Sequence, residues 1–206
     1  MTQTIVDNAA QISFDRDLTV AQTTSASRNI KWFRKGPIQS IFQVQLNPVI
    51  GTTYRTILGS LSDNLVGTYT LSFPEEAVGP PLRGLPDDAV TNRITTRGTP
   101  SGVTLTIQGV AALNGMGAVL TPGQVIKIDG VLGSYIVLNS VNIGSSGEGS
   151  ITLDQPLFST PQAGSRIRVG PEINFDVNLV NRPRAGFGPT GIVTHSGPFI
   201  FSENLQ

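Results

Sequence analysis

Residues 36–73 constrain the fold most, because they read as a strand, a helix and a second strand in succession. Residues 38–46 and 68–73 alternate apolar with polar side chains, as strands with one buried face do. Between them, residues 54–65 repeat apolar side chains at the three-and-four spacing of one helical face. Three apolar faces in one short unit need a shared core, so this unit predicts the packing nucleus of the chain.

The other periodic segments predict a mainly β fold in two parts. Residues 98–170 contain about five short strands separated by glycine-rich turns, which is typical of a small barrel or sandwich. Residues 173–179 alternate cleanly and are expected to return to the sheet of the first part. We therefore expect a β-sandwich or β-barrel with one flanking helix, formed by residues 1–97 and 171–206, and an inserted small β-barrel domain at residues 98–170.

A stretch rich in proline and glycine, residues 74–97, separates the two parts and is expected to be a linker. It contains two acidic pairs, at residues 75–76 and 87–88, which are candidates for the paired carboxylates of a glycoside hydrolase. A linker, however, supplies no scaffold that holds two carboxyl groups at a fixed separation. We therefore expect these acidic side chains to be solvated.

The charge of the chain is low and balanced, with 14% charged residues and a formal net charge of zero over 206 residues. This composition is unlike that of a disordered chain and favours a β protein that covers part of its surface by assembly. The absence of cysteine excludes disulfides and thiolate metal sites. Because no signal peptide and no membrane-spanning apolar run is recognisable, we expect synthesis in a cytoplasm and no membrane insertion.

One basic cluster surrounds the aromatic pair at residues 32–33 and consists of Arg28, Lys31, Arg34 and Lys35. Positive charge beside aromatic rings is typical of phosphate contact. The alternative is an inward-facing aromatic pair with cationic stems at its rim. Four charges in a neutral chain make a patch rather than a nucleic-acid-binding domain. If the cluster has a role beyond packing, we expect contacts with neighbouring subunits first and with DNA second.

The sequence contains no recognisable catalytic or metal-binding motif. His195 is the single histidine and stands beside Ser196, but adjacent residues rarely face each other in a strand, so we expect a loop histidine without a catalytic role. The Asp129-Gly130 turn lacks the acidic ladder of a calcium loop. The glycines match no phosphate-binding loop. We therefore predict no enzymatic activity, no cofactor and no metal site.

A series of segments extends over about residues 12–180 in a fixed order: 42–48, 54–65, 67–74, 122–130 (PGQVIKIDG), 135–138, 151–156 and 166–169. In this order the chain resembles a family of bacteriophage tail proteins. In that family a strand–helix–strand unit ends in an aromatic-rich strand and a proline, and a glycine-rich insert and a return strand follow.

The resemblance implies a structural protein of the distal tail tube or baseplate hub. Such proteins are similar in fold, a β-sandwich or β-barrel with one flanking helix, and they form homo-oligomeric rings, commonly threefold or sixfold, around the lumen through which DNA leaves. The implied partners are further copies of the chain, other tail-tube and baseplate proteins, and nearby DNA. The implied location is the virion tail, assembled in the host cytoplasm.

Three other classes of protein are alternatives. A receptor- or carbohydrate-binding β-module of a tail fibre or tip would expose aromatic residues in a groove, whereas Trp32 and the three tyrosines fall mostly on apolar faces. A capsid decoration protein would differ only in its place in the virion. A cell-wall hydrolase is disfavoured by the single histidine and by the lack of a framed acid pair.

Overall fold

The fold is mainly β, as the sequence predicts. The computed structural model describes residues 3–17, 20–24, 30–34, 38–62, 68–82, 94–109, 113–115 and 117–205.

Five antiparallel strands form the main sheet, in the order β1 (Ala9–Asp17), β4 (Gln39–Leu46), β18 (Phe199–Glu203), β15 (Asn174–Asn181) and β6 (Tyr69–Ser72). The predicted nucleus supplies β4 and β6, and β18 and β15 lie between them. The expectation that residues 173–179 return to this sheet is confirmed, because β15 pairs with both β18 and β6.

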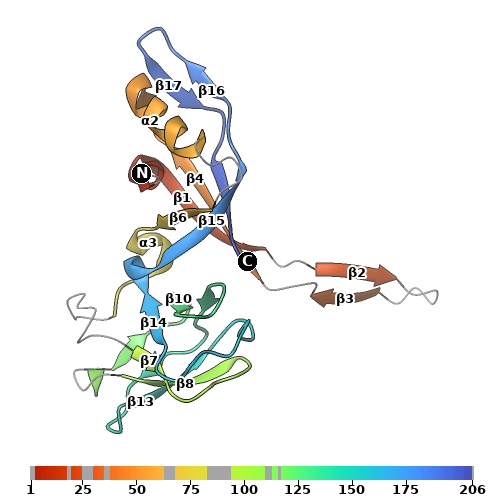
Figure 1. Cartoon of the computed structure of the whole chain (residues 1–206), viewed down its shortest axis with the longest axis vertical. Coiled ribbons are helices and arrows are strands. Elements are labelled where there is room, and N and C mark those ends of the chain that lie inside the picture. The colour runs from red at the N-terminus through yellow and green to blue at the C-terminus, as the bar shows by residue number, and fades with distance from the viewer. Residues whose placement is uncertain are drawn as a thin grey trace.

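Helices lie beside the main sheet (Figure 1). The predicted flanking helix is α2 (Gly51–Ser62), which buries Tyr54, Ile57 and Leu61 on one face. Two short helices, α1 (Gln3–Asp7) and α3 (Glu75–Val78), are additions that the prediction of a single helix lacks. Since α3 buries Val78 in the main core, the first part of the predicted linker is packed structure.

The main core, which α2 and the main sheet share, is rich in aromatic rings. Phe42 stacks on Phe73 with ring centroids 4.2 Å apart and meets Phe175 edge-on at 4.7 Å. These rings come from three segments that are distant in sequence, so the rings unite the nucleus with the return strand. Aromatic pairs of this geometry add about 0.5–1.5 kcal/mol each beyond the burial of their area.

A second sheet contains β11 (Tyr135–Ile136), β10 (Val125–Ile128), β14 (Arg166–Val169), β7 (Ile94–Thr96), β8 (Thr104–Gln108) and β13 (Glu148–Thr152), in that order. Val137 directly follows β11 and Leu153 directly follows β13, and an antiparallel bridge joins these two residues. The sheet therefore curls into a small barrel, one of the two forms that the sequence predicts. A separate pair is formed by β9 (Ala118–Leu120) and β12 (Val141–Asn142).

The sequence places residues 94–96 in the linker, but they form β7, which pairs with β14 and β8 of the barrel. Strand β10 lies between the two cores, since Val125 belongs to the main core and Ile126 to the barrel core. The division of the chain into residues 1–97 with 171–206 and residues 98–170 stays a prediction.

A third sheet caps the α2 end of the molecule and consists of β16 (Ala185–Phe187), β17 (Ile192–His195) and β5 (Val49–Ile50). The sequence shows no strand-like alternation at residues 185–187, whereas the structure has β16 there. Pairing of β16 with β17 explains the difference, because a short glycine-containing strand has little periodicity of its own.

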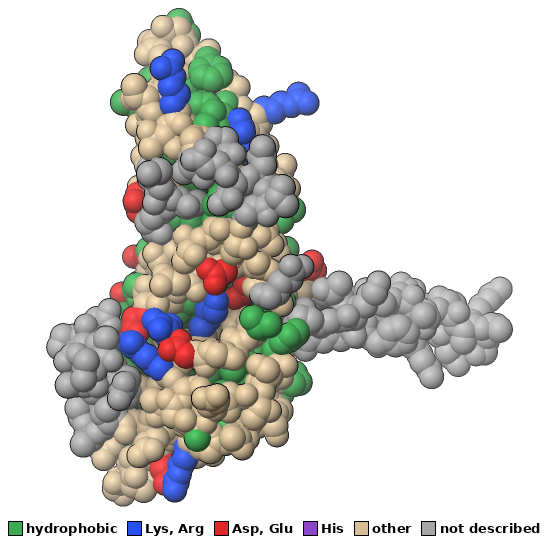
Figure 2. All heavy atoms as spheres, viewed as in Figure 1, with side chains coloured by type: hydrophobic (Ala, Val, Ile, Leu, Met, Phe, Trp, Pro, Cys, Tyr) green, Lys and Arg blue, Asp and Glu red, His purple; other side chains and the backbone are tan. Residues whose placement is uncertain are grey.

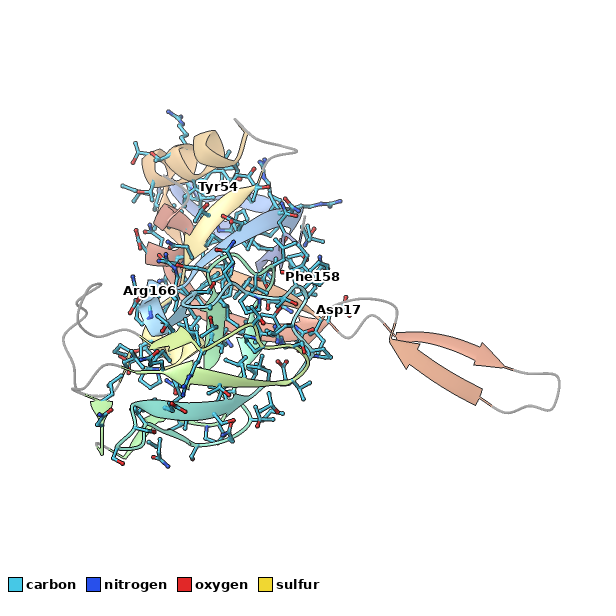
Figure 3. All side chains as sticks on the ribbon, turned by 60° about the horizontal axis from the view of Figure 1, so that its bottom comes forward. Asp17, Tyr54, Phe158 and Arg166 are labelled. Carbon is cyan, nitrogen blue, oxygen red and sulfur yellow. The ribbon has the colours of Figure 1, made fainter. Side chains whose placement is uncertain are left out.

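A hairpin of β2 (Val20–Thr24) and β3 (Ile30–Arg34) extends away from the three sheets (Figures 1 and 3). Among the described strands, β2 and β3 pair only with each other. The hairpin leaves the main sheet between β1 and β4, which are adjacent strands, so its two ends lie close together.

Candidate functional site

The predicted contact residues belong to this hairpin region. Lys31 and Arg34 lie on β3, whereas Arg28 and Lys35 lie outside the described residues, as do the side chains of all four. Their role in subunit or DNA contacts therefore stays a prediction.

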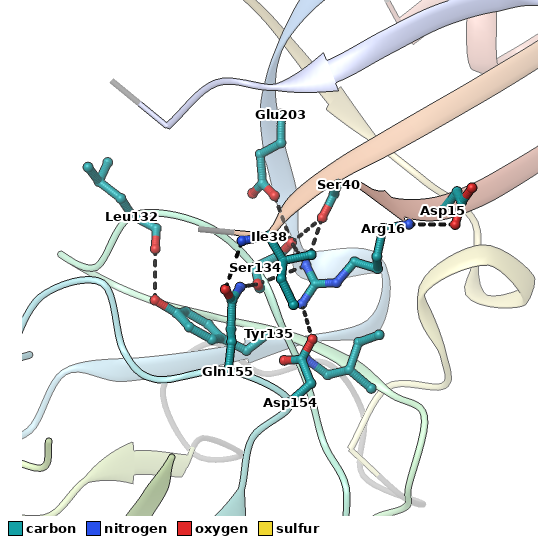
Figure 4. Close-up of polar contacts among 11 residues, drawn as sticks. Asp15, Arg16, Ile38, Ser40, Leu132, Ser134, Tyr135, Asp154, Gln155 and Glu203 are labelled. Atoms are coloured by element: carbon teal, nitrogen blue, oxygen red, sulfur yellow. Dashed lines mark hydrogen bonds and ion pairs between the residues drawn. The ribbon is translucent and has the colours of Figure 1, made fainter. Parts of the chain in front are cut away.

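A buried polar junction lies where the hairpin leaves the main sheet (Figure 4). Arg16 of β1 is directly opposite Ser40 of β4 in the sheet register. Its guanidinium donates from Nη1 to Ser40 Oγ at 2.9 Å and from Nη2 to Asp154 Oδ2 at 2.6 Å. The side chains of Arg16 and Asp154 are only 11% and 15% exposed, so this charge-assisted contact is shielded from water.

Ser134 and Glu203 extend the junction toward the end of β18. Ser134 Oγ donates to Glu203 Oε2 at 2.7 Å and lies 2.6 Å from Ser40 Oγ. Glu203 is fully buried, and Lys127 Nζ lies 3.6 Å from its second oxygen, Oε1. Two cations and two carboxylates thus balance each other within the junction, as buried charges must.

The chain on the other side of the hairpin is held in the same way. The Ile38 N–H donates to Gln155 Oε1 at 3.0 Å, and Gln155 Nε2 donates to the Ser134 carbonyl at 3.2 Å. Arg16 precedes the hairpin and Ile38 follows it. Both ends of the hairpin are therefore bonded to loops of the barrel.

Tyr135 fixes the barrel loops beside the junction. Its hydroxyl donates to the Leu132 carbonyl and accepts the Phe158 N–H, both at 2.9 Å. Burial raises the pKa of Tyr135, so the hydroxyl keeps the proton that it donates. Leu132 and Phe158 themselves are 39% and 48% exposed, which leaves two apolar side chains on the surface next to the junction.

The junction was not predicted, although a local signal exists. Each of three strands has one polar side chain in an inward-facing position, namely Arg16, Ser40 or Glu203. The neighbouring inward-facing positions of these strands are apolar, for example Phe14 and Phe201. A charge in such a position indicates a buried partner. Two partners of Arg16, namely Ser134 and Asp154, stand more than a hundred residues away in sequence, so only the folded chain identifies them.

His195 lies at the end of β17, so the expectation of a loop histidine is wrong. Its ring packs against Tyr54 at 5.2 Å and Phe199 at 5.6 Å between centroids. Neither ring nitrogen has a hydrogen-bond partner among the described residues. Burial lowers the pKa of His195, which favours the neutral ring. Ser196 instead donates its N–H to the Arg184 carbonyl.

The other candidate acids have structural surroundings. Glu75 and Glu76 are exposed on α3, and residues 87–88 lie outside the described part of the chain. Asp129 follows β10 and accepts two hydrogen bonds from Arg168, at 2.6 and 3.2 Å. This contact raises the pKa of Arg168. Asp129 and Arg168 line a hollow of about 500 Å³. Their charges already compensate each other within the chain.

The α2 end carries a hollow of about 550 Å³, which we call the basic groove. Tyr54, Leu58 and Phe187 form its walls, and Arg182 and Arg184 line it with positive charge. Phe187 is 73% exposed and meets Tyr54 edge-on at 5.8 Å. Figure 3 shows Tyr54 at the end of the molecule that bears α2. The groove therefore combines an exposed aromatic ring with two cationic side chains.

Charge compensation is uneven over the described residues. Arg55, Arg182 and Arg184 make no ion pair there, and all three belong to the α2 end. Figure 2 shows cationic and apolar side chains at this end and acidic side chains farther down the same face. The other described cationic side chains each contact a carboxylate, in the pairs Arg16 with Asp154, Arg97 with Glu148, Lys127 with Glu203, Arg166 with Glu172 and Arg168 with Asp129.

A third surface hollow, of about 230 Å³, lies between α1, β1 and α3, and we call it the acidic depression. Its lining includes the apolar side chains of Ile12, Pro74 and Ala77, together with the exposed Glu76. Glu75 adjoins it on α3, is also exposed, and makes no ion pair within the described residues.

The described residues contain no group of three or more acidic or histidine side chains placed to share a metal ion. None of the described helices has the length and apolar character needed to cross a membrane. The sequence matches no protein-family model and no curated protein.

Proposed function

We propose that the chain is a structural protein of a bacteriophage tail. It forms a homo-oligomeric ring at the distal tail tube or baseplate hub and joins the tube to other tail components around the DNA channel. The observation that carries this proposal is the β2–β3 hairpin, which pairs with no other described strand and extends away from the three sheets. An isolated two-stranded hairpin is marginally stable in water, so a neighbouring surface is expected to complete it.

The buried junction supports an assembly role for the hairpin. Arg16 precedes the hairpin and is bonded to Asp154 of the barrel, and Ile38 follows the hairpin and is bonded to Gln155. A segment without a role in a defined contact would not need such fixed attachment points. A contact between the hairpin and a neighbouring subunit would therefore orient the barrel as well. In the proposed ring, the main sheet builds the wall and the barrel contacts other tail proteins.

The exposed apolar residues of the chain also support assembly. Ile50 and Ile192 are cross-strand neighbours of the third sheet and are 62% and 41% exposed. Together with Phe187 at the same end, they form an apolar surface that is exposed to water in the single chain. Ring neighbours commonly bury such surfaces.

Native mass measurement and negative-stain imaging test the proposal. The wild-type chain is expected to form a closed ring with a central hole, and a variant with residues 20–34 replaced by a short turn is expected to stay monomeric with an unchanged circular dichroism spectrum. A compact trimer without a hole would favour the fibre or decoration alternatives. A monomer that is also missing from the tails of purified virions would contradict the proposal.

The basic cluster has its own test. Lys31→Glu combined with Arg34→Glu is expected to impair ring assembly if these side chains contact neighbouring subunits. If this variant forms normal rings, the side chains of the cluster are solvated and have no role in ring assembly.

A further inference from the structure

We infer that the basic groove of one subunit binds the acidic depression of a second copy of this chain. The inference rests on the proposed ring function and names the two faces that meet in it.

The basic groove has the composition of a docking surface. Its cations, Arg182 and Arg184, have no carboxylate partner among the described residues, although five other arginine and lysine side chains do. Phe187 lines the same groove and has 73% of its surface exposed. Aromatic and arginine side chains together are the residue types that dominate binding energy at protein interfaces.

The acidic depression is complementary to this groove in both charge and polarity. Glu75 and Glu76 are exposed and make no ion pair within the described part of the chain. The adjoining hollow is lined by apolar atoms of Val6, Ile12 and Ala77, which can receive an aromatic ring. A projecting ring beside two cations thus matches an apolar hollow beside two carboxylates.

The two surfaces belong to different elements of one subunit. The groove lies on α2 and the segment around β16, whereas the depression lies on α1, β1 and α3. Contact of one face with a different face is a heterologous interface, which repeats from subunit to subunit and closes into a ring when the rotation allows it.

A single-stranded nucleic acid is the other occupant that arginines beside aromatic rings suggest. The observations favour a second copy, because the chain itself carries the matching carboxylates and apolar hollow. Two cations in the groove are also few for a phosphate backbone.

A charge-swap experiment tests the inference on the full chain. One variant combines Arg182→Glu with Arg184→Glu, and the other combines Glu75→Lys with Glu76→Lys. Each variant alone is expected to lower the self-association constant at least about tenfold at low salt, because like charges then face each other. An equimolar mixture of the two variants is expected to recover association, because both kinds of contact between unlike variants, groove on depression in either direction, pair opposite charges.

Arg55→Glu is the matched control, since Arg55 is exposed at the same end but does not line the groove. It is expected to change association much less than the groove variant. Phe187→Ser is expected to weaken association in both the wild type and the mixture. Thermal unfolding of every variant verifies that the monomer fold is intact.

Several outcomes overturn the inference. If the reversed variants still form wild-type rings, other faces make the ring and the proposed function stands. If the wild type stays monomeric at about 1 mM, no interface between copies exists, and the tail role is then decided by locating the chain in virions. If the groove variant loses only binding to a single-stranded DNA oligonucleotide, the groove is a nucleic-acid site.

Discussion

The two cores of this chain are built from different side chains. The main core contains most of the buried rings, namely Phe42, Tyr69, Phe73, Phe175, Phe199 and Phe201. The barrel core is aliphatic apart from Tyr135. Large rings let a few residues fill the space between a sheet and a single helix, whereas branched aliphatic side chains suit the narrow interior of a small barrel.

This difference indicates how each part tolerates change. Removal of a ring from the main core leaves a large cavity that the surrounding strands cannot close. In the barrel, backbone segments lie so close together that added side-chain volume is expected to destabilise the fold more than removed volume does. The polar junction between the two parts adds a third kind of sensitivity, the loss of a charge partner.

The largest effect is expected from Phe42→Ala, which removes the ring that contacts Phe73, Phe175 and Phe14. The free energy of unfolding is expected to fall by about 3–5 kcal/mol because of the cavity. Urea unfolding measures it. Phe14→Ala is the control, since Phe14 is only half-buried, and an equal loss in both variants would contradict the central role of Phe42.

Arg16→Ala is expected to cost about 3 kcal/mol, because it leaves the carboxylate of Asp154 without its partner in a buried site. Arg97→Ala is the matched control. The ion pair of Arg97 with Glu148 is 53% and 38% exposed, so its loss is expected to cost less than about 1 kcal/mol. Similar losses in the two variants would show that the junction contributes no more than a surface pair.

Glycine-to-alanine changes are expected to differ in sign between the two parts. A Cβ at Gly149 of the barrel would lie 2.7 Å from the Asn142 carbonyl oxygen, so Gly149→Ala is expected to destabilise by about 1–3 kcal/mol. A Cβ at Gly59 of α2 meets nothing within 4 Å, so Gly59→Ala is expected to stabilise by up to about 1 kcal/mol. Thermal unfolding checks both, and the same sign for both would contradict this contrast.

The smallest effect concerns pH. Because burial places the pKa of His195 below its ordinary value of 6.5, the unfolded chain takes up a proton before the folded chain does. Stability is therefore expected to decrease as pH falls below about 6.5, by less than about 1 kcal/mol for this single group. His195→Phe is expected to remove the decrease between pH 7 and 5.5 in unfolding measurements. An unchanged pH dependence in that variant would assign it to other groups.

Local periodicity predicted much of the fold. The alternation around Phe42, the helical repeat through Ile57 and the return strand around Phe175 all correspond to described elements. The short helices α1 and α3 and the strand β16 were not predicted, because each is too short to show a period. The sequence position of the predicted basic cluster near Trp32 does not identify the contacts that its side chains make.

The candidate surfaces depend more strongly than the strands and helices do on contacts between residues that are distant in sequence. Arg16 meets Ser134 and Asp154 only because the barrel packs against the end of β1, and the basic groove exists only because β16 lies beside α2. Side-chain alternation is a property of neighbouring residues, so the amino-acid order alone establishes a mainly β chain with one amphipathic helix. Strand order, the buried charge partners and the uncompensated arginines arise from residues distant in sequence, and packing in three dimensions is what brings them together.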